Sequence, residues 1–158
     1  MPQIIGSTTN GTTQAFAQSY IAIAKFVASA TGTMEQLRIN SFGGSNVKLA
    51  VYADNGSGTD AGTRLWVNNT GVYLAAGWNS FWVSPGLSIT SGTTYWIGCN
   101  LEAADRVNYD STGGTIAYKV ADYTTVGCPA DASGGVGAAY NFAMQGWSMV
   151  GRNNAMMF

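Results

Sequence analysis

The sequence predicts an all-β fold, an antiparallel β-sandwich of jelly-roll type. Helical periodicity is nearly absent, and short runs of β-forming residues recur between clusters of Gly, Asn, Asp and Ser. The composition agrees, with 21 Gly and 12% aromatic residues but only 9% charged residues. The chain of 158 residues has the length of one domain, so we expect residues 1–158 to form a single sandwich.

The first third of the chain contains three strand candidates and a loop. Ser19–Val27 is rich in β-forming residues, and Met34–Asn40 places its Leu and Ile on one face and its Arg on the other. Val47–Tyr52 alternates Val, Leu and Val with Lys, Ala and Tyr. Asp54–Thr63 has no apolar residue larger than Ala, so it is predicted to be a loop.

The middle of the chain continues the same pattern. Arg64–Tyr73 is a strand candidate with a bend near Asn68-Asn69. Trp78–Val83 has two distinct faces, one with two Trp and a Ser and the other with Asn, Phe and Val. Pro85-Gly86 is a typical turn dipeptide. Thr93–Leu101 is the strongest candidate for a buried strand.

The last third contains a predicted hairpin, a long loop and a closing strand. Arg106–Asp110 and Thr115–Val120 form the hairpin candidate, joined by a turn that contains Gly-Gly. The segment Thr124–Gly137 is a loop by composition, and loops of this length are often functional or interfacial. Ala139–Val150 is the closing strand. The chain then has nine or ten strands, spaced as in a sandwich or jelly roll.

Charge and residue usage exclude several classes of function. The sequence has no His, which removes Ser-His-Asp and Cys-His catalysis and zinc sites that use imidazole. Seven Lys and Arg against eight Asp and Glu give a net charge of -1 without a basic stripe, so no nucleic acid partner is expected. No apolar run reaches the ~18 residues of a membrane span. We expect no cofactor and no enzymatic activity, although the composition leaves a carboxylate-based glycosidase open.

Both ends of the chain carry large apolar residues, whereas free termini tend to be polar. We expect the terminal segments, about residues 1–18 and 151–158, to take part in subunit contacts; the alternative is that they pack on their own domain. The candidate interface residues are Ile4, Ile5, Met156, Met157 and Phe158.

A series of turn and core motifs runs through the middle of the chain. The series comprises Gly32-x-Met34-x-x-Leu37-x-Ile39, Val47-x-Leu49-Ala50-Val51-Tyr52-Ala53-Asp54-Asn55-Gly56, Gly77-Trp78-Asn79, Leu87-Ser88-Ile89-Thr90-Ser91-Gly92-Thr93-Thr94-Tyr95-Trp96 and Asn108-Tyr109-Asp110-Ser111. It resembles β-sandwich modules of tailed-phage structural proteins and of some bacterial secreted surface proteins. The resemblance covers about residues 19 to 123 and ends before Gly127-Cys128-Pro129. It implies a non-catalytic module on the surface of a particle or cell.

The aromatic residues are the first candidate for a binding site. Sugar-binding sandwiches stack flat aromatic rings on the apolar face of a sugar and bond its hydroxyls with polar side chains. The alternative is that these residues belong to the core or to a protein interface. The candidate glycan-binding residues are Trp78, Trp82, Tyr73 and Trp66.

Two further candidate sites involve carboxylates and thiols. Asp54 and Asp60 in the predicted loop offer oxygen ligands of the kind that Ca²⁺ takes, although the ligand set is incomplete and a solvated turn explains them equally well. Cys99 and Cys128 are either a disulfide that pins the long loop or two buried thiols.

These observations together predict a non-enzymatic structural protein. We expect a phage virion surface subunit, a capsid decoration or a tail or fibre component, that self-associates or docks on a particle. Its expected partners are itself, other virion or surface proteins, and a cell-surface glycan. Two alternatives remain, a carbohydrate-binding (lectin-like) module and an extracellular filament subunit. The chain opens without the basic segment and apolar run of a secretory signal, which favours the virion over an extracellular location.

Overall fold

The computed structural model describes residues 2–11, 13–15, 19–103, 107–110 and 113–148. Every regular element within these ranges is a β-strand, and every pairing between strands is antiparallel. The predicted all-β antiparallel fold class is therefore confirmed. Within the same ranges there is no helix with the length and apolarity that crossing a membrane requires.

The described strands join in one continuous sheet with the order β1-β11-β4-β6-β3-β8-β9; β5 pairs with β4, and β7 pairs with β2, β4 and β10. The strands are β1 (Gln3–Gly6), β2 (Thr13–Ala15), β3 (Tyr20–Val27), β4 (Gly32–Asp54), β5 (Ala61–Ile89), β6 (Thr94–Leu101), β7 (Val107–Asp110), β8 (Ile116–Val120), β9 (Val136–Ala138), β10 (Asn141–Phe142) and β11 (Met144–Ser148).

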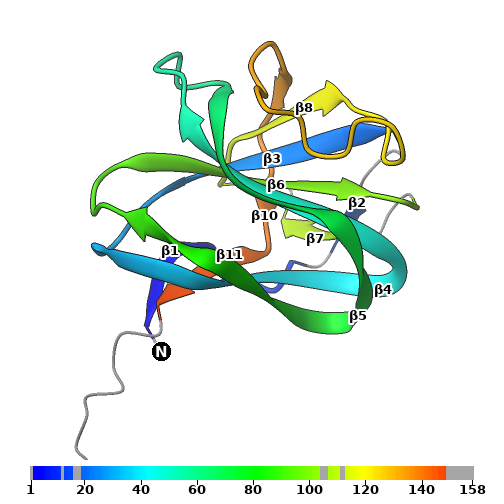
Figure 1. Ribbon diagram of the computed structural model, residues 1–158, viewed down its shortest axis with the longest axis horizontal. Coiled ribbons are helices and arrows are strands. Elements are labelled where there is room, and N and C mark those ends of the chain that lie inside the picture. Colours follow the sequence, from blue (N-terminus) through cyan, green and yellow to red (C-terminus); the bar gives the residue numbers. More distant parts are fainter. Residues whose placement is uncertain (1, 12, 16–18, 104–106, 111–112, 149–158) are drawn as a thin grey trace, which may run out of the picture.

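The long hairpin of β4 and β5 connects the two sides of the molecule (Figure 1). The first half of β4 pairs with β11, and its second half pairs with β6. The change occurs at a register shift between Phe42 and Ser45, where Gly43 and Gly44 both have positive φ angles. A Cβ atom on Gly43 would lie 2.8 Å from the backbone nitrogen of Ala76, so the bend requires glycine there.

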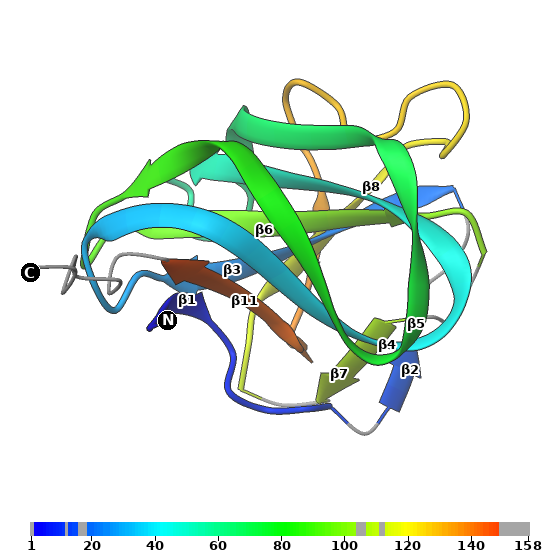
Figure 2. The same ribbon diagram turned by 60° about the horizontal axis from the view of Figure 1, so that its bottom comes forward.

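The main core lies between the two sides of this folded sheet (Figures 1 and 2). On one side, Leu37 and Ile39 enter it from the first half of β4, and Phe81 enters it from the part of β5 that pairs with them. On the other side, Leu49 enters it from the second half of β4 and Ile97 from β6. This arrangement is compatible with the predicted sandwich, while the jelly-roll connectivity stays a prediction.

The core also contains Ile4 and Ile5, which corrects their assignment to a subunit interface. They are 1% and 2% exposed and pack inside their own chain. A register shift between Gln3 and Ile5 in the pairing of β1 with β11 interrupts the usual alternation, so two consecutive residues are buried. The other interface candidates, Met156, Met157 and Phe158, lie outside the described residues.

A second, smaller core lies on the outer face of β3, β4, β6 and β8, beneath residues 121–135, which we call the strap. Tyr52, Trp96 and Cys128 are buried there. The Tyr52 hydroxyl donates to the Pro129 carbonyl at 3.0 Å. At the start of the strap, hydrogen bonds led by that from the Thr124 hydroxyl lower the pKa of Asp122 to about 2, so this turn keeps its charge at neutral pH.

The sheet separates the two cysteines, which settles the choice between a disulfide and two thiols. Cys99 faces the main core from β6, whereas Cys128 lies in the second core beneath the strap. Both are free and buried thiols, so the second of the two alternatives, two buried thiols, holds and the disulfide does not form. Burial raises the pKa of Cys128 to about 12 and also raises the pKa of Cys99.

The turn predicted at Pro85-Gly86 differs from the structure. Pro85-Gly86 lies within β5, where Leu87 pairs with Met34 and Trp82 pairs with Gln36, so the segment between them bulges opposite one residue of β4. Proline fits such a bulge on a strand whose only strand partner among the described residues is β4, because no ladder hydrogen bond is lost.

The predicted hairpin of Arg106–Asp110 and Thr115–Val120 is also wrong. Its second strand, β8, pairs with β3 and β9. Its first strand, β7, pairs with β2, β4 and β10. The Gly-rich segment between the two strands therefore connects different parts of the sheet.

Candidate functional site

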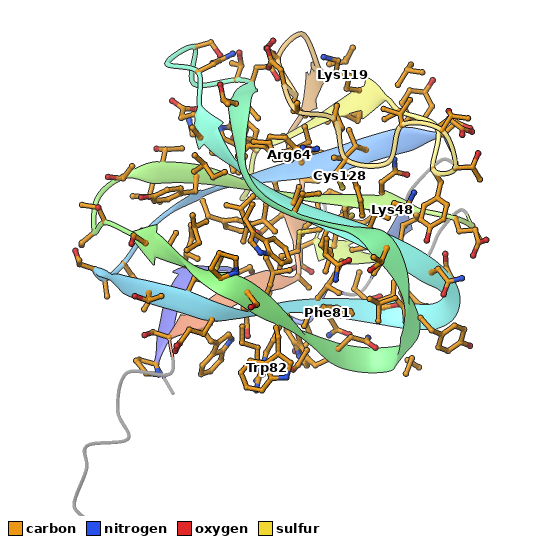
Figure 3. The ribbon with its side chains drawn as sticks, viewed as in Figure 1. Lys48, Arg64, Phe81, Trp82, Lys119 and Cys128 are labelled. Atoms are coloured by element: carbon orange, nitrogen blue, oxygen red, sulfur yellow. The ribbon has the colours of Figure 1, made fainter. Side chains whose placement is uncertain are left out.

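Two of the predicted aromatic residues project together from the second half of β5. Trp82 is 63% exposed and Trp78 is 36% exposed, whereas Phe81 and Val83 between and beside them are buried. Figure 3 shows Phe81 and Trp82 leaving β5 on opposite sides. The two faces predicted for Trp78–Val83 are thus confirmed. The two indoles are four residues apart, so their backbones lie about 13 Å apart along the strand.

The pairing of three strands extends this surface. Trp82 on β5 is opposite Gln36 on β4, and Gln36 is opposite Trp147 on β11. The backbones of the two tryptophans are two strand spacings apart, about 10 Å. We call the outward side chains of this part of the sheet the Trp82 face. They are Gln36, Arg38, Asn40, Trp78, Ser80, Trp82, Gln145 and Trp147.

Hydrogen bonds and stacking fix one half of the Trp82 face. The Arg38 guanidinium carbon lies 4.6 Å from the centroid of the Trp147 ring, and Arg38 Nε donates to Gln36 Oε1 at 2.9 Å. Trp147 Nε1 donates to Gln145 Oε1 at 2.9 Å, and Gln145 Nε2 donates to the Ser7 carbonyl at 2.8 Å. The planar groups of this half are therefore held in place by one another and by the backbone at Ser7.

A second set of hydrogen bonds fixes the other half through the segment that follows β1. Trp78 Nε1 donates to Asn10 Oδ1 at 2.9 Å, and Asn40 Nδ2 donates to the Asn10 carbonyl at 3.0 Å. Asn40 Oδ1 accepts from Asn108 Nδ2 at 3.1 Å. Asn10 thus forms a rim that orients the Trp78 ring.

The other two predicted glycan-binding residues do not join this face. Trp66 is only 9% exposed and belongs to the main core, where its Nε1 has no hydrogen-bond partner within the described part of the chain. Its assignment to a glycan site is corrected, because no ligand can stack on a ring that the core covers. Tyr73 is 64% exposed but is opposite Asn46, beyond the bend of the long hairpin, and so lies apart from Trp78.

The carboxylates of the weak Ca²⁺ candidate have structural hydrogen-bond partners. Asp54 Oδ1 accepts from Trp96 Nε1 at 2.7 Å. Asp60 accepts from the backbone amide of Ala61 at 2.9 Å and from those of Gly134 and Gly135 in the strap. These contacts hold the two ends of the loop, and no group of three His, Cys, Asp or Glu side chains within the described residues is placed to hold a metal ion.

Sequence reasoning missed half of the Trp82 face. The alternation in Met34–Asn40 indicated that Arg38 faces away from Leu37 and Ile39, but nothing local indicated which residues lie beside it. Trp147 and Gln145 are more than a hundred positions away along the chain, and only the pairing of β11 with β4 brings them there.

No family model matches the chain, and neither the curated proteins nor the solved structures contain a match.

Proposed function

We propose that this protein is a non-enzymatic recognition module of a phage particle surface, and that it binds saccharides through the Trp82 face. The observation that carries the proposal is the pair of outward indoles on β5 next to planar polar side chains that are already held in place. Flat rings stack on the apolar face of a sugar, while amides and a guanidinium bond its hydroxyls. Placement on strands gives the precision that such contacts need.

The rigidity of the side chains in the Trp82 face supports this proposal, because it lowers the entropic cost of binding. Immobilising a flexible side chain on binding costs about 0.5–1.5 kcal/mol. Gln36, Asn40 and Gln145 are each less than 9% exposed and already hydrogen-bonded, so little of this cost remains. Trp82 has only two side-chain torsions and offers a large flat surface at low entropic cost.

The distribution of exposed apolar residues also favours this face. The other large apolar side chains that are exposed within the described ranges are distributed over several elements: Val27 on β3, Phe42 on β4, Leu65 and Tyr73 on β5, Val120 on β8, Val126 in the strap and Val136 on β9. Scattered exposure of this kind is ordinary. Trp78 and Trp82, by contrast, share one side of β5, and a third indole, Trp147 on β11, lies two strand spacings from Trp82 on the same face.

The phage-particle setting within this proposal is supported by the sequence resemblance. Self-association, the other part of the sequence-based expectation, loses the support of Ile4 and Ile5, because both are buried in their own chain. A second copy of the chain that docked on the Trp82 face would also cover Trp82. The mass of the protein in solution distinguishes such a dimer from a monomer that binds a saccharide.

The test is a panel of immobilised saccharides probed with the wild-type chain and with Trp82→Ala. We expect the wild type to bind at least one saccharide and Trp82→Ala to bind it at least about tenfold more weakly, because loss of a stacked ring removes roughly 1.4 kcal/mol or more. Leu65→Ala is the matched control, since Leu65 is an apolar residue on the same strand that is 43% exposed outside the face.

Two results would contradict the proposal. One is the absence of binding to every saccharide in the panel. The other is binding that Trp82→Ala leaves unchanged. Light scattering on the same samples measures self-association. A protein that uses the Trp82 face to self-associate would bind no saccharide, and its mass in solution would be lower in Trp82→Ala than in the wild type.

A further inference from the structure

The Lys and Arg side chains that the structure describes fall into two groups according to what they contact. Five of its seven Lys and Arg residues lie in the described part of the chain. Four of these five donate to a backbone carbonyl of a loop: Lys25 to Gly58, Lys48 to Tyr123, Arg64 to Cys128 and Lys119 to Ser133. Figure 3 shows Lys48, Arg64 and Lys119 around the strap, away from Trp82. These four cations hold loops in place.

Arg38 is different, because both of its partners are neutral side chains of the Trp82 face. Its Nε atom donates to Gln36, and its guanidinium lies over the Trp147 ring. Among the described residues it forms no ion pair, and its two terminal amino groups donate to none of them. These two groups are the pair with which arginine binds a carboxylate in a bidentate manner.

The position of Arg38 within the face is central. It is directly opposite Ser80 on β5 and Gln145 on β11. Trp78, Trp82 and Trp147 are therefore its diagonal neighbours across the strands, at about 7–8 Å between backbones, which long side chains can span. A sugar ring stacked on Trp82 thus has its edge within reach of the guanidinium.

Partial burial strengthens the attraction of Arg38 for an anion. The side chain is half-buried and packed against an indole, so its guanidinium has lost part of its hydration without gaining a counter-ion from the residues that the structure describes. The protein carries a net charge of -1, so the attraction is local to this face rather than a property of the whole surface.

We propose that the saccharide bound by the Trp82 face carries a carboxylate, as uronic and sialic acids do, and that Arg38 binds this group. The proposal rests on the proposed function, since it names the chemical class of the ligand of the same site. The ring of the acidic sugar stacks on Trp82, and its carboxylate accepts two hydrogen bonds from the terminal amino groups of Arg38.

The test compares three acidic probes with their own methyl esters, which keep the sugar and remove the charge. The probes are a galacturonate oligomer, a mannuronate oligomer and sialyllactose. We expect the wild-type chain to bind at least one acid at least tenfold more tightly than its ester, and we expect this difference to shrink as salt rises. Arg38→Gln should remove the preference for the acid, because it should weaken the binding of the acid by a much larger factor than the binding of the ester.

Two further variants separate recognition of a carboxylate from a general effect of charge or folding. Arg38→Lys keeps the charge but loses the planar fork, so an intermediate preference is expected. Lys119→Gln removes one positive charge far from the face and should leave the preference unchanged. The thermal midpoint of each variant, measured without ligand, shows whether it is folded.

The failure of this proposal differs from the failure of the proposed function. If wild type binds acid and ester equally, or binds only neutral saccharides in a manner that Trp82→Ala abolishes, then the carboxylate proposal is overturned and the proposed function stands. If Arg38→Gln weakens acid and ester by the same factor, Arg38 only positions Trp147, and the carboxylate proposal is again overturned. If no acid, ester or neutral saccharide binds, both proposals are overturned.

Discussion

Replacing Trp96 with alanine is expected to lower the free energy of unfolding by about 3–5 kcal/mol, the usual cost of removing a buried tryptophan. Trp96 is fully buried in the second core, and its Nε1 donates to Asp54 Oδ1 at 2.7 Å. The substitution leaves a cavity beneath the strap and also frees the carboxylate that holds the start of the Asn55–Asp60 loop. Because domains of this size have about 5–15 kcal/mol of stability in total, the variant loses a large fraction of its free energy of unfolding.

Urea denaturation of Trp96→Ala and Trp82→Ala measures this effect with a matched pair. Both variants lose the same side chain, but Trp82 is 63% exposed, so its loss should change the free energy of unfolding by no more than about 0.5 kcal/mol. Equal destabilisation in the two variants would contradict the burial described for Trp96 and the exposure described for Trp82.

Asn100→Ala is expected to be the second most damaging change, at about 2–4 kcal/mol, through loss of the strap. Asn100 is fully buried, and its Nδ2 donates to the carbonyls of Ala121 at 2.9 Å and Gly127 at 2.7 Å. Without it two buried carbonyls lose this donor, at about 1–3 kcal/mol each. The Asn100 Oδ1 atom has no hydrogen-bond partner among the described residues, which offsets part of this loss.

Alkylation of Cys128 reports whether the strap has opened. In the wild type the thiol is fully buried, and burial raises its pKa to about 12, so thiolate is scarce at pH 8 and alkylation is slow. Asn100→Ala should accelerate alkylation of Cys128 at least tenfold while Cys99, in the main core, stays protected.

The control for the strap is Asn46→Ala, which removes an exposed hydrogen bond to Glu102 and should change neither stability nor alkylation. Equal rates of Cys128 alkylation in the wild type and in Asn100→Ala would show that Asn100 does not hold the strap.

Local alternation predicted the strands well, because burial on a sheet repeats every two residues. The segment Trp78–Val83 and the strand at Thr94–Leu101 were both evident from sequence. Long-range pairing was not. Pro85-Gly86 has the composition of a turn, but a bulge in an edge strand accommodates it without a change of direction, and nothing in the local sequence distinguishes the two.

The candidate site shows the same division between local and distant information. Trp78 and Trp82 were predicted because each belongs to one short alternating run. Trp66 was misplaced because either face of its strand could be the inner one: Leu65 is 43% exposed and Trp66 is buried, the reverse of what a glycan platform needs. The role of Arg38 could not be predicted from its local sequence, because its stacking partner Trp147 is brought to it only by the pairing of β11 with β4.

The most direct test of saccharide binding by the Trp82 face follows the five tryptophan indole N–H signals in an NMR titration with the saccharide that the panel selects. Single Trp→Phe variants assign the signals. We predict that the signals of Trp78, Trp82 and Trp147 shift with one common affinity, while those of Trp66 and Trp96 stay in place because both rings lie in the cores. Binding that leaves the Trp82 and Trp147 signals unmoved would contradict the account.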